Sequence, residues 1–427
     1  MPVQQPLAGK ILSTKTPTVI PPSKKRVLLI SATPTHPMTA GNRARVYALL
    51  EALEALGFDF HFAFITWENA DASAMQKRWG EQRVSIISPR FTQRHSALWR
   101  RIRNRTLRSL RLERYHPLEV DCYRSPELQR AIEELGQKIK PECVIVEYIF
   151  NSWMLELFPS TVRKLIDTHD KFADRYEQLL KAGIEPEWFS TTRRQERKGL
   201  RRAHCILAIQ DQEADYFRNL TGREVITVGH ISSIDSIADP DTGIPTVLLI
   251  GGNHTCNRDA VSYCLSKIWP IIRSQLPKTR LLIAGRICES ISGAEQGVEL
   301  CGQVPELAAV YARAHVVLNP VRGGTGLKIK SIEALSYGRP LVTTPAGCLG
   351  IEGGNGRAFL VGNDAKNLAE LCLLLLRDPQ WRSALASEAI RFVTDCNHKN
   401  YQALKRALGM VELMPAGGGL RSETNSL

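Results

Sequence analysis

Short runs of aliphatic residues recur along the whole chain, and helical patterns separate most of them. Examples are RVLLI at 26–30, CVIVEY at 143–148, TVLLIGG at 246–252 and VVLNP at 316–320. Continuous aliphatic strands that alternate with helices predict parallel sheets covered on both faces. Between the two series, the stretch 233–245 reads SIDSIADPDTGIP, which has the composition of a linker. The sequence therefore predicts two doubly wound α/β domains that bind ligands at the carboxyl ends of their strands, facing a cleft.

The length of 427 residues agrees with this division, since domains average roughly 150 residues. We expect the first domain at 26–238 and the second at 245–395. The flanking segments, 1–25 and 415–427, are rich in Pro, Gly and polar residues, and the first is also basic. Both are predicted to be disordered tails.

A strongly basic segment interrupts the first domain. The stretch 90–114 holds nine arginines and one acidic residue, with leucines and an isoleucine among them. This pattern predicts an amphipathic helical insert at about 90–116. Together with the net charge of +13 it favours an anionic partner. A solvated surface helix and docking on an anionic membrane are both open interpretations. Nucleic acid is not expected, because no aromatic stacking platform accompanies the arginines.

The remaining composition narrows the class of protein. The ten cysteines form no C-x-x-C pair, so we expect reduced core residues and neither disulfides nor a metal site. The sequence contains no run of about 18 apolar residues, so no transmembrane helix is predicted. Residues 1–25 lack the apolar segment of a secretory signal. We therefore predict a cytoplasmic protein that docks, if at all, peripherally on the inner membrane face.

The stretch RGGTGLKIKSIEALSYGRP at 322–340 directly follows the predicted strand VVLNP. Its glycines lie at a strand-to-helix junction, where the first N–H groups of a helix are unpaired and carry partial positive charge. Glycine allows an anion close to the backbone, and Lys328 and Lys330 add full charges. The pattern favours a diphosphate site, and a plain turn is the alternative. Glu333 suits a ribose diol, with a surface salt bridge to Lys330 as the alternative.

These segments resemble the retaining, nucleotide-sugar-dependent glycosyltransferases of family 4, which have the GT-B fold of two Rossmann-like domains. The similarity runs from about residue 26 to 408 and is strongest over 306–347, where P-x-x-x-G-T-G-L-K-x-K precedes E-A and G-x-P. The resemblance implies a nucleoside diphosphate sugar bound mainly by the C-terminal domain and an acceptor bound mainly by the N-terminal one. It also implies that a C-terminal helix, here at 396–413, packs back toward the N-terminal domain.

The resemblance assigns donor-side roles to several residues. It places Thr325, Gly326 and Leu327 on the diphosphate and Glu333 on the ribose. The other donor-side residues that it implies are Gly41, Gly251, Gly252, Arg258, Gly302 and Val304. Thr325 stands where the family usually has a glutamate that contacts the sugar, and Asn253 and Arg258 stand where it usually has an arginine and a lysine. We expect Lys328 and Arg286 to supply instead the positive charge that binds the diphosphate.

On the acceptor side, Gly41, Arg43 and Arg45 follow the first strand, and His169 and Asp170 end the strand KLIDT. The resemblance implies that His169 contacts the donor sugar, whereas a structural role is the alternative. Arg43, Arg45 and Asp170 are predicted to face the acceptor. His169, Lys328 and Glu333 are the predicted catalytic residues.

The predicted function is transfer of a sugar to an acceptor hydroxyl with retention, in the synthesis of an envelope or extracellular polysaccharide or a lipid-linked glycan. The resemblance implies that the leaving diphosphate helps to deprotonate the acceptor, so no enzymic nucleophile is required. No metal and no further cofactor are expected. A nucleotide-sugar epimerase or other GT-B enzyme, and a non-catalytic scaffold, are the alternatives.

Overall fold

The computed structural model describes residues 25–89, 118–181, 183–184, 189–240, 243–293 and 295–410. The predicted basic insert, and all but residue 25 of the two predicted tails, lie outside these ranges. In the part of the chain that is described, no helix is both long and apolar enough to cross a membrane.

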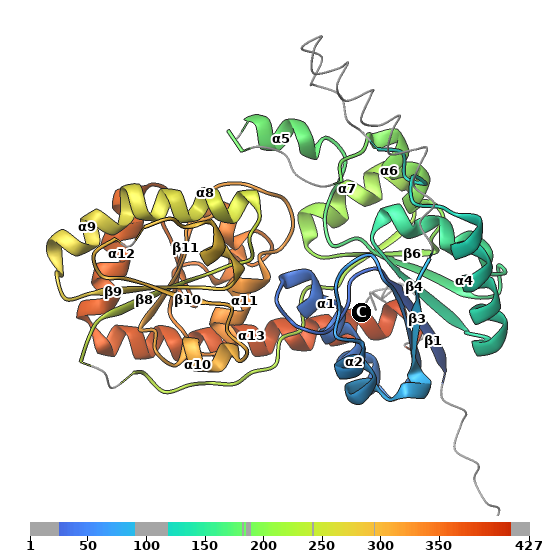
Figure 1. The fold of residues 1–427 in the computed structure, drawn as a ribbon, viewed down its shortest axis with the longest axis horizontal. Coiled ribbons are helices and arrows are strands. Elements are labelled where there is room, and N and C mark those ends of the chain that lie inside the picture. Colours follow the sequence, from blue (N-terminus) through green and yellow to red (C-terminus); the bar gives the residue numbers. More distant parts are fainter. Residues whose placement is uncertain are drawn as a thin grey trace, which may run out of the picture.

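The N-terminal half forms a seven-stranded sheet in which every neighbouring pair is parallel. The strand order is β3-β2-β1-β4-β5-β6-β7. The strands are β1 (Arg26–Ser31), β2 (Asp59–Ile65), β3 (Val84–Ile87), β4 (Cys143–Glu147), β5 (Arg163–Asp167), β6 (Cys205–Ala208) and β7 (Glu224–Thr227). The central strands are almost entirely buried because helices cover both faces of the sheet (Figure 1).

Each face of this sheet has its own apolar core. The described helices of this half are α1 (Gly41–Ala55), α2 (Ala72–Trp79), η1 (Glu81–Arg83), α4 (Pro126–Ile139), η2 (Ile149–Leu157), α5 (Arg175–Lys181), α6 (Arg193–Leu200) and α7 (Asp211–Thr221). One core lies under α1 and α2, and the other under α4, η2 and α7.

The C-terminal half repeats the plan with a six-stranded parallel sheet of order β10-β9-β8-β11-β12-β13. Its strands are β8 (Thr246–Ile250), β9 (Arg280–Ala284), β10 (Val298–Gly302), β11 (Val316–Asn319), β12 (Leu341–Thr343) and β13 (Leu360–Val361). Its helices are α8 (Thr255–Tyr263), η3 (Cys264–Ile268), α9 (Trp269–Gln275), η4 (Arg286–Ser290), α10 (Leu307–Tyr311), α11 (Ile329–Ser336), η5 (Pro345–Cys348), η6 (Glu352–Gly354) and α12 (Ala365–Arg377). The prediction of two doubly wound domains is confirmed.

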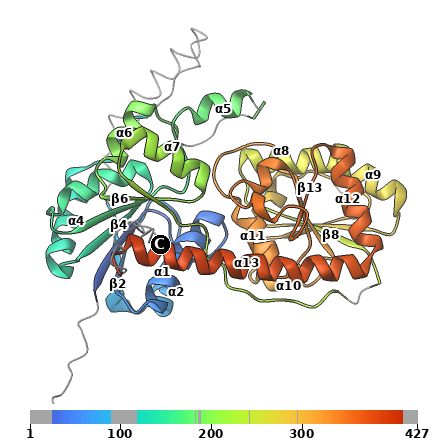
Figure 2. The same cartoon turned by 180° about the vertical axis from the view of Figure 1, so that it is seen from behind.

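A single 29-residue helix, α13 (Pro379–Ala407), runs along both halves (Figures 1 and 2). It starts against the C-terminal core, where Leu385 is buried, and ends in the N-terminal core, where Leu404 is fully buried. Near its end, Asn397 and Asn400 hydrogen bond with the backbone of residues 229–232. The division expected between 395 and 396 falls inside this helix.

Candidate functional site

A cavity of about 550 Å³ lies between the two halves, at the carboxyl ends of both sheets. The loops after β1, β4 and β5 line it from the N-terminal half, and those after β8, β9, β10 and β11 line it from the other. Ligands of doubly wound folds bind at this edge of the sheet. If the predicted site residues bind a ligand together, they should line this cavity.

The glycine turn between β11 and α11 forms one wall. Gly324 and Gly326 adopt positive φ values of 95° and 74°, which favour glycine. Among the described residues, no acceptor is found for the backbone N–H groups of Thr325, Gly326 and Leu327. The side-chain Oγ1 of Thr325 is also buried there, and it has no hydrogen-bond partner within the described part of the chain. The turn thus presents a group of donors at the N-terminus of a helix, as an anion requires.

Lys328 stabilises this turn from within. Its Nζ donates to the carbonyl oxygens of Gly324 (3.3 Å), Thr325 (2.9 Å) and Gly326 (2.8 Å). Burial lowers the pKa of the ammonium, against the opposing effect of nearby Asp170. Because the carbonyl and N–H of a trans peptide point in opposite directions, a lysine that gathers the carbonyls leaves the N–H groups for a ligand.

Glu333 lies one turn further along α11 and lines the same cavity. Burial raises the pKa of this carboxyl group to about 7, although Lys330 opposes the shift. Lys330 itself donates to Asn257 Oδ1 at 2.8 Å, and burial beside Lys328 lowers its pKa to about 8. The alternative of a salt bridge between Lys330 and Glu333 is therefore not what the structure contains.

The loops after β8, β9 and β10 form the outer wall of the donor side. Gly251, Gly252, Arg286 and Val304 line the cavity. Gly285 has to be glycine, since a Cβ there would lie 2.3 Å from the carbonyl oxygen of Gly251.

Two predicted donor-side residues are not among those that line the cavity. Gly302 ends β10 just before Gln303, which does line it. Arg258 turns back on its own loop, where its guanidinium donates to Asn253 Oδ1 and Thr255 Oγ1, both at 3.1 Å. Its charge therefore stabilises the loop.

Gly41 brings the two halves together. A Cβ at this position would lie 3.3 Å from the Cβ of Ile329, so the N-termini of α1 and α11 meet here. The turn after β5 approaches in the same way, since a Cβ at Gly326 would lie 3.1 Å from the carbonyl oxygen of His169 and 3.3 Å from Asp170 Oδ1. Two glycines thus permit contact across the cavity.

The structure places Arg43 and Arg45 outside the cavity lining, in contrast to their predicted acceptor-side role. Arg43 donates to Glu68 Oε2 at 2.9 Å and to the carbonyl oxygen of Pro37 at 3.2 Å. Arg45 forms a buried bidentate pair with Asp167, at 2.7 and 2.6 Å. Their charges are already used within the N-terminal half.

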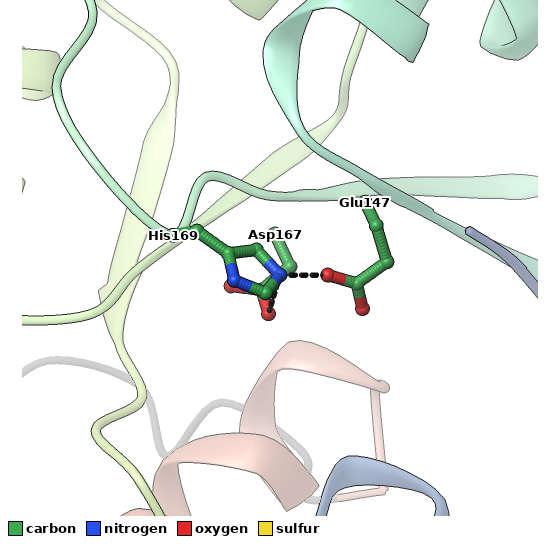
Figure 3. Close-up of side chains that lie close together, drawn as sticks. All are labelled: Glu147, Asp167 and His169. Carbon is green, nitrogen blue, oxygen red and sulfur yellow. Dashed lines mark hydrogen bonds and ion pairs between the residues drawn. The ribbon is translucent and has the colours of Figure 1, made fainter. Parts of the chain in front are cut away.

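His169 and Asp170 both line the cavity. The His169 ring stacks on Tyr148 with 4.1 Å between centroids, and its Nε2 is hydrogen bonded to Glu147 Oε2 (Figure 3). Both His169 and Tyr148 have positive φ values, 57° and 66°. Non-glycine residues in this region are strained and concentrate at functional sites.

Glu147, Asp167 and His169 place three potential ligand atoms within 4.8 Å of one another. Both carboxylate oxygens of Asp167 accept hydrogen bonds from Arg45, however. A guanidinium at this distance repels a metal cation, so the donor set does not favour one. The expectation that no metal is needed remains a prediction.

Sequence reasoning missed three polar groups at the site. Glu147 ends a buried strand, and an acidic residue at that place in CVIVEY was an available signal. Arg175 lines the cavity from the start of α5 and pairs with Asp170 Oδ2 at 3.1 Å. Cys256 lines it beside Gly324, and only the tertiary fold brings it there.

The structure is a two-domain α/β protein with hydrogen-bond donors exposed to the cavity between its halves. Comparison with solved structures agrees with the GT-B fold. The sucrose-phosphate synthase of Thermosynechococcus elongatus superposes with a TM-score of 0.62 at 19% identity, covering 91% of this chain and 97% of that one. The pneumococcal O-GlcNAc transferase GtfA, solved with UDP and GlcNAc, gives 0.62 at 11% identity over 91% and 100%. HepE of Anabaena, solved with UDP and glucose, gives 0.60 at 12% identity over 90% and 99%. The chain has the GT-B fold.

Residues 244–378 match the family "Glycosyl transferases group 1", so the C-terminal half is a glycosyltransferase domain of family 4. A curated relative, an uncharacterized 44.6 kDa protein in the cps region of Klebsiella pneumoniae, is 23% identical over 37% of this chain. The match spans 43% of that relative, less than half its length.

Proposed function

We propose that the protein is a retaining glycosyltransferase that transfers a sugar from a nucleoside diphosphate sugar to an acceptor hydroxyl. The observation that carries the proposal is the glycine turn at 323–327. Its backbone donors, Lys328 and the N-terminus of α11 together face a cavity shared by both halves. The family 4 match of the surrounding domain supports the same reaction.

The chain's own residues supply charge stabilisation and orientation. The N–H groups of 325–327 and the dipole of α11 bind the diphosphate and stabilise the charge that develops as it leaves. Glu333, as a carboxylate, accepts hydrogen bonds from the ribose. His169, on the opposite wall, faces the transferred sugar. Holding donor and acceptor between the two walls provides much of the acceleration, because it replaces an encounter in solution.

The nucleotide and the route are further parts of the proposal. GtfA and HepE were both solved with UDP, which supports a uridine diphosphate donor. The relative encoded in a cps region supports a place in polysaccharide synthesis. We propose an acceptor that is a glycan or a lipid-linked glycan, and peripheral docking on an anionic membrane through 90–114. That segment lies outside the described residues, and its role rests on its sequence.

A thermal-shift screen with nucleoside diphosphates tests donor binding. A ligand that binds only the native state raises the melting temperature, by an amount that reports its affinity. We expect UDP to stabilise the protein and Lys328→Met to lower the affinity about tenfold or more, because the turn loses the cation that holds its carbonyl oxygens. Lys366→Met is the matched control, because the Lys366 side chain is 79% exposed at the surface of α12.

Incubation with labelled UDP-sugars and acceptor glycans then tests transfer. We expect a labelled glycan that retains the anomeric configuration of the donor. A labelled epimer formed without acceptor would replace the proposal with an epimerase. Failure of every nucleoside diphosphate to bind would instead favour a non-catalytic scaffold.

A further inference from the structure

Glu147 has no place in the reaction as described so far, yet it is held at the edge of the site. It is the last residue of β4, is fully buried and does not line the cavity. Its Oε2 is hydrogen bonded to His169 Nε2. Its second oxygen, Oε1, is buried without a hydrogen-bond partner in the described structure. A buried carboxylate with an unsatisfied oxygen costs stability, so a purely structural role does not account for it.

The surroundings of His169 fix which of its nitrogens meets a ligand. Nε2 faces Glu147 Oε2 and lies 3.6 Å from Asp167 Oδ2. Neither Glu147 nor Asp167 lines the cavity, whereas His169 does. A bare lone pair on Nε2 would face two carboxylates, so this nitrogen carries the proton and donates it to Glu147. The neutral ring then presents Nδ1 as a hydrogen-bond acceptor.

The charges nearby support this arrangement. Arg45 pairs with both oxygens of Asp167 and so balances that carboxylate. Burial and the neighbouring Asp167 raise the pKa of Glu147, whereas His169 and Arg45 oppose this shift. Its Oε2 is the acceptor that faces the Nε2 proton. One face of the ring is covered by Tyr148, which stacks in turn on Phe150 at 5.1 Å. Stacking on Tyr148 fixes the plane of the ring. The hydrogen bond to Glu147, drawn in Figure 3, fixes its rotation within that plane.

We propose that Glu147 is a positioning residue that holds His169 through Nε2 and so directs Nδ1, as an acceptor, toward a hydroxyl of the bound sugar. This inference rests on the proposed function. The strained backbone at His169 and Tyr148 agrees with it, because both residues adopt conformations that local sequence does not favour. Asp170, directly after His169, faces Arg175 and Lys328 and takes no part in this contact.

Two substitutions test the proposal. Glu147→Met keeps the length of the side chain but removes the acceptor, and Glu147→Gln keeps an acceptor oxygen without the charge. We expect Glu147→Met to lower kcat roughly tenfold or more, as loss of a partner that orients an active-site histidine does elsewhere. Glu147→Gln should recover part of that loss. The affinity for UDP should stay within about twofold of wild type, because Glu147 does not reach the diphosphate.

The melting temperature separates positioning from structure. Glu147→Met removes the unsatisfied Oε1 but also leaves the Nε2–H of His169 without its acceptor, so the two effects oppose each other and the melting temperature should change little. The matched control is Glu196→Gln, which alters another buried carboxylate of the same half. Glu196 accepts from the backbone N–H groups of Phe172 and Ala173 and from Tyr216, without contacting His169. It should lose stability with little change in kcat.

Nitrogen-15 NMR of histidine-labelled protein tests the geometry without any turnover. The His169 signals, assigned by their loss in His169→Gln, should show the proton on Nε2 in the neutral ring. A proton on Nδ1, or an unchanged kcat in Glu147→Met, would overturn the inference. If wild type neither binds UDP nor transfers sugar, the proposed function fails, while the NMR result still decides whether Glu147 sets the histidine tautomer.

Discussion

Arg43 and Arg45 show that the position of a residue in the sequence does not fix the direction of its side chain. Both were predicted to face the acceptor because they open the helix after the first strand, in a loop that the family resemblance places at the cleft. Residues two apart on a helix point about 200° from each other, so both cannot face one ligand. The structure turns Arg45 into the core toward Asp167 and Arg43 toward Glu68. Tertiary partners decide these directions, and no local pattern reveals them.

The glycine turn at 323–327 is the opposite case, because the residues that form it are neighbours in the sequence. Glycines, lysines and a helix start are adjacent in sequence, so their arrangement as a turn of backbone donors could be predicted from spacing alone. The sequence marks Glu147 as an acidic residue at a strand end, but it does not reveal the contact with His169, which lies 22 residues away and is brought beside it only by the pairing of β4 with β5.

Gly326→Ala tests how closely the two walls approach. The new Cβ would lie 3.1 Å from the carbonyl oxygen of His169, and φ is 74°. We expect a loss of about 1–2 kcal/mol in stability from the backbone conformation and, in addition, a lower affinity for UDP because the turn shifts.

Gly57→Ala is the matched control for that change. Gly57 has a φ of 79°, and no atom of the residues that the structure describes lies within 4 Å of the added Cβ. It carries the backbone strain without the contact, so it should lose stability and keep its UDP affinity. Equal UDP affinities in both variants would show that the walls do not need this approach.

Glu333 links pH to donor binding. Its pKa of about 7 lies above that of an exposed carboxyl group, so it is largely protonated at pH 6 and ionised at pH 8. Only the carboxylate accepts from both ribose hydroxyls, so we expect UDP to bind more weakly at pH 6 than at pH 8. In Glu333→Gln this difference should be much smaller, as calorimetry at the two pH values would show.

The same residue makes an opposite prediction for stability. A carboxyl group whose pKa is raised on folding favours the folded state fully below about pH 4.5, and this contribution is lost as the pH rises through about 7. The free energy of unfolding of wild type should therefore fall between pH 6 and pH 8, relative to Glu333→Gln, by about 1 kcal/mol. Parallel curves from urea unfolding would contradict the assignment.

At the scale of elements, strands and helices followed closely from aliphatic runs and helical periodicity. Prediction from periodicity was limited where contacts with neighbouring segments determine the conformation. The 3-10 helix η2 follows β4 with a run of buried residues that has no clear period. The end of α13 belongs to the core of the other half. Periodicity reports that a helix exists, whereas its partners depend on the fold.

Leu404→Ala tests the anchoring of α13. Leu404 is fully buried in the N-terminal core, so truncation should cost about 2–5 kcal/mol. Leu374→Ala is the control, because Leu374 is 46% exposed on α12 and its truncation should change stability by about 0.5 kcal/mol or less. Similar values from urea unfolding of the two variants would mean that the end of α13 contributes little.

At the scale of the whole molecule, the two halves are joined by more than a linker. Arg339 is buried and donates to the carbonyl oxygens of Ile237 and Ala238, which fixes the linker to the C-terminal half. Asn400 fixes α13 to the segment after β7. The linker is therefore fixed to the C-terminal half and α13 to the N-terminal half by hydrogen bonds.

We expect wild type to unfold in a single calorimetric transition, because neither half can lose its core without disturbing α13. Leu404→Ala should separate the transition into two, with the N-terminal half melting first. Two well-separated transitions in wild type would show that the halves are thermodynamically independent.

The continuity of α13 has a consequence for recombination between related enzymes. Consider a chimera in which the C-terminal half is exchanged by a single junction in the linker. The last turns of its α13 would come from a protein with a different N-terminal core, and they would pack poorly. The natural junction therefore lies within the helix, before Asn397, so that the residues after it stay with the N-terminal half. Swapping donor specificity in this fold means cutting the chain twice, once in a loop and once through a helix.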